Sequence, residues 1–130
     1  MKRLIRHVLI ISAAMAAMAG TAATPQELLA AYVQAAGQRA DATAGQTFFN
    51  TKHGRDWSCA TCHTATPVTS GKHATTSKVI APLAPSSDPT RFVDAAKTEK
   101  WFRRNCNDVV GRECTASEKA NVLAWLISLK

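Results

Sequence analysis

Cys59-Ala60-Thr61-Cys62-His63 is the stretch of this 130-residue sequence that decides which fold to expect. The C-x-x-C-H spacing is typical of covalent haem attachment, in which two thiols add to the vinyl groups of the porphyrin and the histidine binds the iron. A thioredoxin-like pair needs a βαβ context, a zinc site needs a second pair of ligands, and a disulfide across this spacing closes a strained ring. We therefore expect one covalent haem c, held by the two cysteines and the histidine.

The first 23 residues have the layout of a secretory signal peptide. Three basic residues precede an apolar stretch over 8–19, and small residues follow it as candidate cleavage sites. The apolar stretch of about a dozen residues is shorter than the roughly 20 needed to span a bilayer, which favours cleavage over a membrane anchor. The sequence thus predicts a signal peptide over 1–23 and a soluble, periplasmic domain over 24–130.

The charge of the chain argues against one class of partner. The formal net charge is +7, and it falls to +4 when the three cations of the predicted signal peptide are removed. So weak a basic balance does not indicate a nucleic-acid-binding protein. All four cysteines lie in the predicted mature part, where an oxidising compartment would allow disulfides to persist.

Helical signals occur on both sides of the motif. Thr24-Pro25-Gln26-Glu27 and Thr115-Ala116-Ser117-Glu118 each have the pattern of a capping box at the start of a helix. Apolar residues recur at helical spacing after both boxes, and in two further stretches. We expect helices over about 25–37, 42–51, 89–104 and 116–129, with a turn-like segment over 105–114.

The segment 64–89 has a different character from the rest of the chain. It contains four prolines with many serines and threonines, which predicts a long loop. No part of the chain shows the alternation of a β-strand. We therefore expect an all-α fold with one long irregular loop, in which a bound cofactor supplies packing surface that a small domain lacks.

The second axial ligand is not evident from the motif. A methionine is the common partner of histidine in small cytochromes c. The three methionines of this chain, Met1, Met15 and Met18, all lie in the predicted signal peptide, so the mature domain has none. The remaining candidates are a lysine, a thiolate, an open position, His53, His73 and Asn105.

A resemblance to a known family narrows these candidates. The stretch from Trp101 to Thr115, WFRRNCNDVVGRECT, together with CATCH at 59–63, resembles the SHP family of oxygen-binding monohaem cytochromes c. Pro82-Leu83-Ala84-Pro85 and Arg91-Phe92 are similar too, and the resemblance covers roughly residues 40–130. It implies a class I cytochrome c-like fold, whose N- and C-terminal helices cross.

The resemblance also implies a ligand set and partners. In that family an asparagine directly before a disulfide-bonded cysteine is the sixth ligand of the ferric iron, and it leaves on reduction so that a diatomic molecule (O₂, NO or CO) can bind. Carried over, the ligands are His63 and Asn105, and Cys106 pairs with Cys114. The implied electron donors are a dihaem cytochrome c and a membrane b-type cytochrome.

The sequence therefore predicts an exported cytochrome c that carries one electron and binds a diatomic ligand, rather than an enzyme. Two alternatives remain. A bis-histidine electron carrier would use His73 or His53 as its second ligand. A haem enzyme acting on peroxide or NO would need an acid–base group above the iron, and the same two histidines are the candidates for it.

Overall fold

A computed structural model describes residues 22–130, and these residues form five helices and one short hairpin. The predicted signal peptide over 1–23 falls almost wholly outside the described residues, so its cleavage stays a prediction. None of the helices in the described part has the length and hydropathy of a membrane span. The elements are α1 (Pro25–Ala36), α2 (Ala42–Asn50), α3 (Cys59–His63), β1 (Gly71–Lys72), β2 (Val79–Ile80), α4 (Ala95–Val110) and α5 (Ala116–Ser128).

Both predicted capping boxes are confirmed. The Thr24 hydroxyl accepts the Glu27 N–H at 3.1 Å, and the Glu27 carboxylate accepts the Thr24 N–H at 2.7 Å. Thr115 and Glu118 make the same pair of bonds at 3.2 and 2.8 Å. Arg112 binds Glu118 through two nitrogens and lowers the pKa of that carboxyl. The starts of α1 and α5 are therefore set by bonds within one turn of chain.

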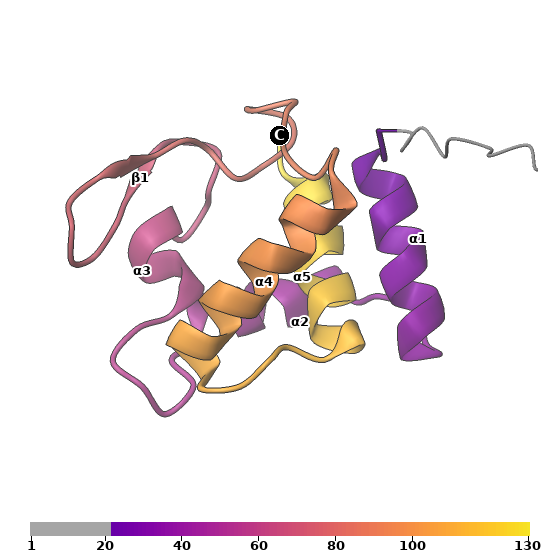
Figure 1. Cartoon of the computed structure of the whole chain (residues 1–130), viewed down its shortest axis with the longest axis horizontal. Helices are drawn as coiled ribbons and strands as arrows, with labels where there is room; N and C mark the ends of the chain where they lie inside the picture. Colours follow the sequence, from indigo (N-terminus) through magenta and orange to yellow (C-terminus); the bar gives the residue numbers. More distant parts are fainter. Residues whose placement is uncertain (1–21) are drawn as a thin grey trace, which may run out of the picture.

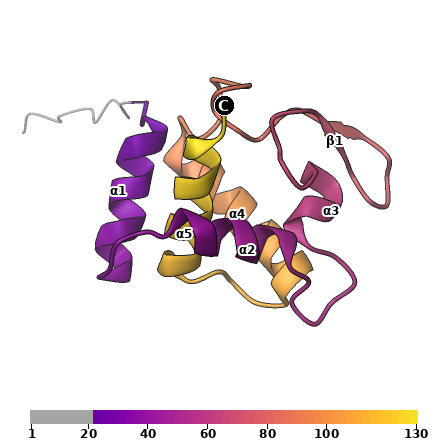
Figure 2. The same cartoon turned by 180° about the vertical axis from the view of Figure 1, so that it is seen from behind.

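Helix α5 is the centre of the fold, and it packs against α1 on one side and α2 on the other. Figure 2 shows α2 crossing in front of α5, with α3 beyond the end of α2. Two groups of buried side chains fill these contacts: Leu28, Tyr32, Ala120 and Leu123 between α1 and α5, and Phe49, Val122, Trp125 and Leu126 between α2 and α5.

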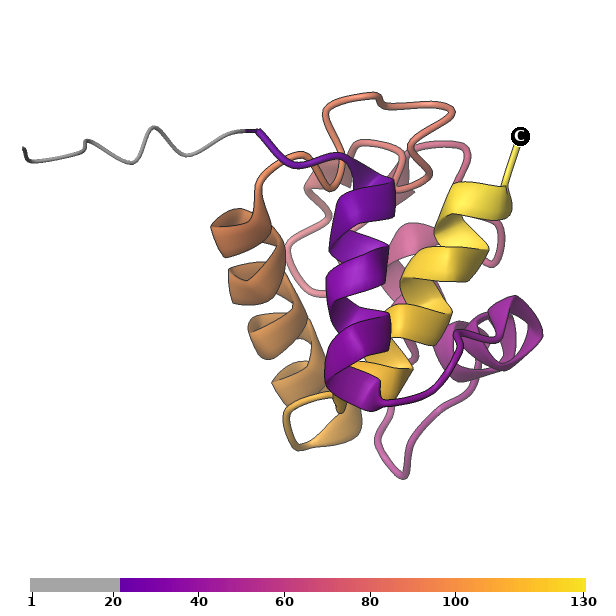
Figure 3. The same cartoon turned by 90° about the vertical axis from the view of Figure 1, so that its right-hand side faces the viewer.

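The crossing of α2 and α5 is tight because α2 has a glycine at the contact. A Cβ on Gly45 would overlap the carbonyl of Asn121 and come within 2.8 Å of the Val122 nitrogen. One turn further on, the rings of Phe49 and Trp125 lie 5.0 Å apart. The crossing that the family resemblance implies is thus present, and the all-α fold is confirmed. Helix α1 adds a further layer beside α5 and α4 (Figure 3).

Helix α4 begins and ends later than predicted. Asp94 is its N-cap and accepts the Lys97 N–H at 2.9 Å, whereas Phe92 has a φ of 60°, which no helix interior adopts. At the other end α4 continues to Val110, and Gly111 closes it with a φ of 78°. The prediction of a turn-like segment over 105–114 was therefore wrong in its first half. Asn105 lies inside a helix.

The predicted long loop runs between α3 and α4, but it contains a hairpin that the sequence did not reveal. Strands β1 and β2 pair antiparallel, with Gly71 opposite Ile80 and Lys72 opposite Val79. Strands of two residues each are too short to show a recognisable alternation of apolar and polar side chains. Figure 1 shows the hairpin beside α3, where a Cβ on Gly71 would lie 3.0 Å from the His63 Cα.

Candidate haem site

A largely apolar cavity of about 410 Å³ lies between α3, α4, α5 and the hairpin. Cys59, Cys62 and His63 contribute to its wall from α3, and Phe49 and Leu126 contribute from the α2–α5 crossing. The C-x-x-C-H motif therefore faces this cavity. The tight α2–α5 crossing positions the motif, because α2 is followed directly by the loop that leads to α3.

Helix α3 is a single turn and places its two cysteines on the same side. It starts at Ser58, whose N–H donates to the Thr61 hydroxyl at 2.9 Å. The two thiols are not bonded to each other. Burial raises the pKa of the Cys59 thiol to about 11. A redox-active C-x-x-C pair has a lowered thiol pKa instead, so the Cys59 thiol does not have the electrostatics of a thioredoxin-like site.

His63 is held neutral by its surroundings. Burial, aided by the positive charge of Arg91, lowers the pKa of the imidazole to about 4. Neutral imidazole is the form that binds a metal ion. The Arg91 guanidinium donates to the carbonyls of Pro82 and Ala81, both at 2.7 Å, and pairs with Asp88 at 3.2 Å. The charge near His63 is thereby kept in place.

One face of α4 forms another part of the cavity wall. The cavity-lining residues Thr98, Trp101, Phe102, Asn105 and Val109 recur every three or four positions, which makes them one stripe of the helix. The half-buried Asn105 side chain makes no hydrogen bond to any described residue. The amide of Asn107, by contrast, donates to the Arg103 carbonyl at 2.8 Å. The Asn105 amide is thus available to a group inside the cavity.

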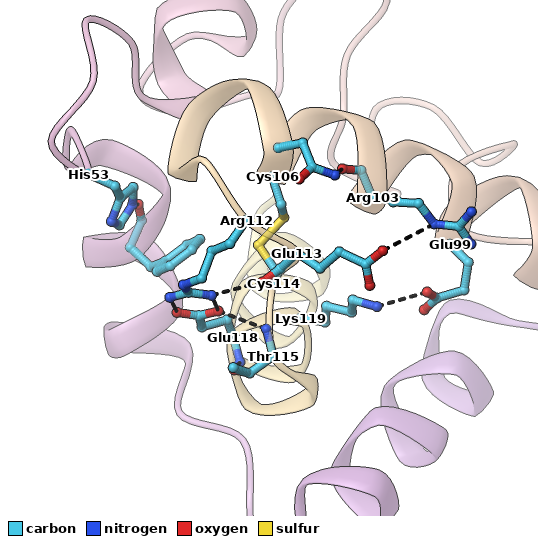
Figure 4. The surroundings of a disulfide bond; sticks show 12 residues. His53, Glu99, Arg103, Cys106, Arg112, Glu113, Cys114, Thr115, Glu118 and Lys119 are labelled. Atoms are coloured by element: carbon cyan, nitrogen blue, oxygen red, sulfur yellow. Dashed lines mark hydrogen bonds and ion pairs between the residues drawn. A yellow bond between two sulfur atoms is a disulfide. The ribbon is translucent and has the colours of Figure 1, made fainter.

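A disulfide fixes the helix end that carries Asn105. Cys106 and Cys114 are joined, with their Cα atoms 5.6 Å apart, and this is the pair that the family resemblance implies. Figure 4 shows the bond linking the end of α4 to the start of α5, with ion pairs on both sides. The Arg103–Glu113 pair at 3.6 Å is exposed and contributes little to stability.

Removing this disulfide should destabilise the protein. Replacing both Cys106 and Cys114 with alanine is expected to lower the free energy of unfolding by about 2–3 kcal/mol, since the bond closes a short loop in the unfolded chain. Urea denaturation of the haem-loaded protein, followed by far-ultraviolet circular dichroism, measures this. An unchanged midpoint and slope would contradict the prediction.

The two other histidines of the described chain differ in position. The His53 ring lies 4.2 Å from the Phe48 ring, its Nε2 is 2.8 Å from the Phe48 carbonyl, and it does not line the cavity. His73 does line the cavity, from the hairpin, together with Lys78. Sequence reasoning missed the contribution of the hairpin. The only available signal was the spacing of Gly71, His73, Lys78 and Ile80 around a polar turn.

The residues of the cavity fit a haem. Two thiols one turn apart, a neutral, half-buried imidazole beside them and a mostly apolar wall are the features that covalent attachment and iron ligation require. Among residues 22–130 no cluster of three or more His, Cys, Asp or Glu side chains is placed to hold a bare metal ion.

Comparison with known proteins identifies the family. A family model described as a domain of unknown function, DUF1924, matches residues 35–126. The cytochrome c-type protein SHP of Cereibacter sphaeroides is 51% identical over 124 residues, which are 91% of this chain and 95% of that protein. The chain belongs to the SHP family of c-type cytochromes. It is therefore a c-type cytochrome, a protein class that carries haem c covalently.

Solved structures agree with this membership of the SHP family. The structure of oxidized SHP, described as an oxygen-binding cytochrome c, has a TM-score of 0.75 and 50% identity, and the match covers 81% of this chain and 96% of that one. Oxidized cytochrome c'' from Methylophilus methylotrophus has a TM-score of 0.74 and 37% identity over 82% of this chain and 94% of its own. Both share the helical fold described above.

Proposed function

We propose that this cytochrome is an exported electron carrier that binds a diatomic molecule when reduced. Cys59 and Cys62 tether its single haem, and His63 and Asn105 are the axial ligands. Residues 1–23 are a signal peptide, and residues 24–130 are the mature periplasmic domain. A disulfide in the described residues supports this compartment, because disulfides persist where the surroundings are oxidising.

The observation that carries the proposal is the placement of Asn105. Its amide lines the same cavity as His63, is half-buried and has no hydrogen-bond partner among the described residues. The amide atoms are accessible from the cavity, so a group bound there can contact them. No methionine is present in the described chain to compete for it.

The chemistry of the two side chains supports a redox-dependent ligand. Haem supplies an iron that accepts and releases one electron. His63 offers a neutral imidazole nitrogen, which suits both oxidation states. Asn105 offers a neutral amide oxygen, a hard and weak donor that binds ferric iron better than the softer ferrous iron. Reduction should therefore release the Asn105 side chain and leave room for a small molecule.

The choice of small molecule rests on the family. The relative whose structure is described as an oxygen-binding cytochrome supports O₂, and NO and CO are diatomics of similar size. The proposed electron donors are a dihaem cytochrome c and a membrane b-type cytochrome. An electron carrier of this kind is favoured over an enzyme, since only His73 of the two histidines considered as acid–base groups lines the cavity.

Visible spectra of the purified protein test the proposed function. The ferric form should be six-coordinate, and the ferrous form should change its Soret band on addition of CO. A ferrous spectrum that CO leaves unchanged would show a ligand that stays bound after reduction. The diatomic-binding proposal would then fail, while covalent haem attachment would stand.

A further inference from the structure

We propose that the hairpin over 71–80 binds a propionate carboxylate of the haem, with His73 and Lys78 as the donors. His73 is accordingly a carboxylate-binding residue and not an axial ligand. The inference rests on the proposed attachment of haem through Cys59 and Cys62, and it is independent of the role of Asn105.

The register of the hairpin places both donors on its inner face. Gly71 pairs with Ile80 and Lys72 with Val79, and the His73 N–H donates to the Lys78 carbonyl at 2.9 Å as the next rung. Side chains alternate across a strand, so the residues at 71, 73, 78 and 80 share one face. Of these, His73, Lys78 and Ile80 line the cavity, whereas Lys72 does not and Val79 is 73% exposed.

Hydrogen bonds within the turn determine which nitrogen of His73 carries the proton. Its Nδ1 accepts the N–H groups of Thr75 and Thr76, at 3.3 and 3.2 Å. A nitrogen that accepts two hydrogen bonds carries no proton, so the proton of the neutral ring is on Nε2. His73 therefore presents an N–H donor. Binding iron through Nε2 would require moving that proton to Nδ1 and breaking both turn bonds.

The hairpin is seated against the tethering helix. The Ala74 N–H lies 3.4 Å from the Cys62 sulfur, and Gly71 permits close approach to the backbone at Cys62 and His63. A haem bonded to Cys62 would bring its periphery next to this hairpin, and the propionates belong to that periphery. Donors on the inner face of the hairpin would therefore be in a position to meet a carboxylate.

The charges of the wall match a carboxylate at this edge. The hairpin contributes an imidazole N–H and an ammonium group, and the Thr76 hydroxyl also lines the cavity. The only acidic side chain in the described wall is Asp108, which lies on α4 and not on the hairpin. Hydrogen bonds between a carboxylate and charged donors are the stronger kind in proteins.

Resonance Raman spectroscopy of the haem-loaded protein tests the inference through the propionate bending band. The band should shift in His73→Ala and in Lys78→Gln, and it should keep its wild-type position in Lys72→Gln, which removes the same charge from the outer face of the same hairpin. His73→Gln retains an N–H donor, so its propionate band should lie closer to the wild-type position than the band of His73→Ala does. The reduction potential should fall in the first two variants, because the carboxylate charge is less compensated.

Two outcomes would overturn the inference. One is a propionate band at the same position in all four variants. The other is a change in the ferric axial-ligand bands of His73→Ala, which would make His73 an iron ligand. A pyridine haemochrome spectrum of each variant first shows that haem is attached. Failure of the Asn105 proposal would be seen separately, as an unchanged ferric spectrum in Asn105→Ala.

Discussion

Asn105→Ala is expected to raise the affinity of the ferric protein for an added ligand such as imidazole by about tenfold or more. In the wild type an incoming ligand must displace the amide, so its apparent dissociation constant is the intrinsic constant divided by the small fraction of molecules in which Asn105 is released. Alanine cannot reach into the cavity, and this competition disappears. Titration of the Soret band with imidazole measures the change, and the ferric spectrum without added ligand should change as well.

Asn107→Ala is the matched control for this experiment. It removes the same amide from the same helix, but Asn107 is exposed, donates to the Arg103 carbonyl and does not line the cavity. It should therefore bind imidazole as the wild type does. Equal affinities in wild type and Asn105→Ala would contradict the assignment of Asn105 as a ligand.

Gly45→Ala should cause a large loss of stability for the addition of a single methyl group. The new Cβ would overlap the Asn121 carbonyl, and a backbone atom cannot rotate away as a side chain can. Overpacking of this kind costs typically 1–3 kcal/mol, occasionally more. Because the clash is with backbone, we take the upper end of that range, about 3 kcal/mol. Alanine gains roughly 1 kcal/mol of helix propensity over glycine, which leaves a net loss of about 2 kcal/mol. Thermal denaturation of the haem-loaded protein measures it.

Gln46→Ala provides the comparison, since Gln46 is the exposed neighbour of Gly45 on α2. Its free energy of unfolding should stay within about 0.5 kcal/mol of the wild type. If Gly45→Ala also stayed within that range, the α2–α5 contact would have to be looser than the structure shows. Neither variant touches the residues proposed to bind haem.

Much of this fold could be predicted because its signals are local. The capping boxes at Thr24 and Thr115 use residues three positions apart, so the chain near them suffices to start α1 and α5. The end of α4 could not be predicted in the same way. Asn105 and Cys106 precede Asn107, Asp108 and a glycine, a composition that indicates a turn, yet the helix persists to Val110. Packing of its inner stripe outweighs that preference.

The residues of the candidate site also differ in how far the sequence alone could predict them. The motif at 59–63 is short enough for its spacing alone to indicate the attachment of haem, and the count of methionines is a property of composition. Asn105 stands out only through the family resemblance, because by composition it is one of several possible ligands. His73 was a candidate by residue type alone, but its place beside Lys78 on one face of a hairpin could not be predicted, because two strands of two residues leave no periodic pattern.

The order of the residues alone predicts a tethered cofactor, a candidate ligand at His63 and the starts of the first and last helices. Those features depend on atoms that are close together along the chain. Only the tertiary structure shows that Asn105, 42 positions after His63 in the sequence, lines the same cavity as His63. It also shows that His73 lines this cavity and that its Nδ1 accepts two hydrogen bonds, which leaves the proton on Nε2. Cavities are made by segments that are distant in sequence, and their walls depend on how those segments pack.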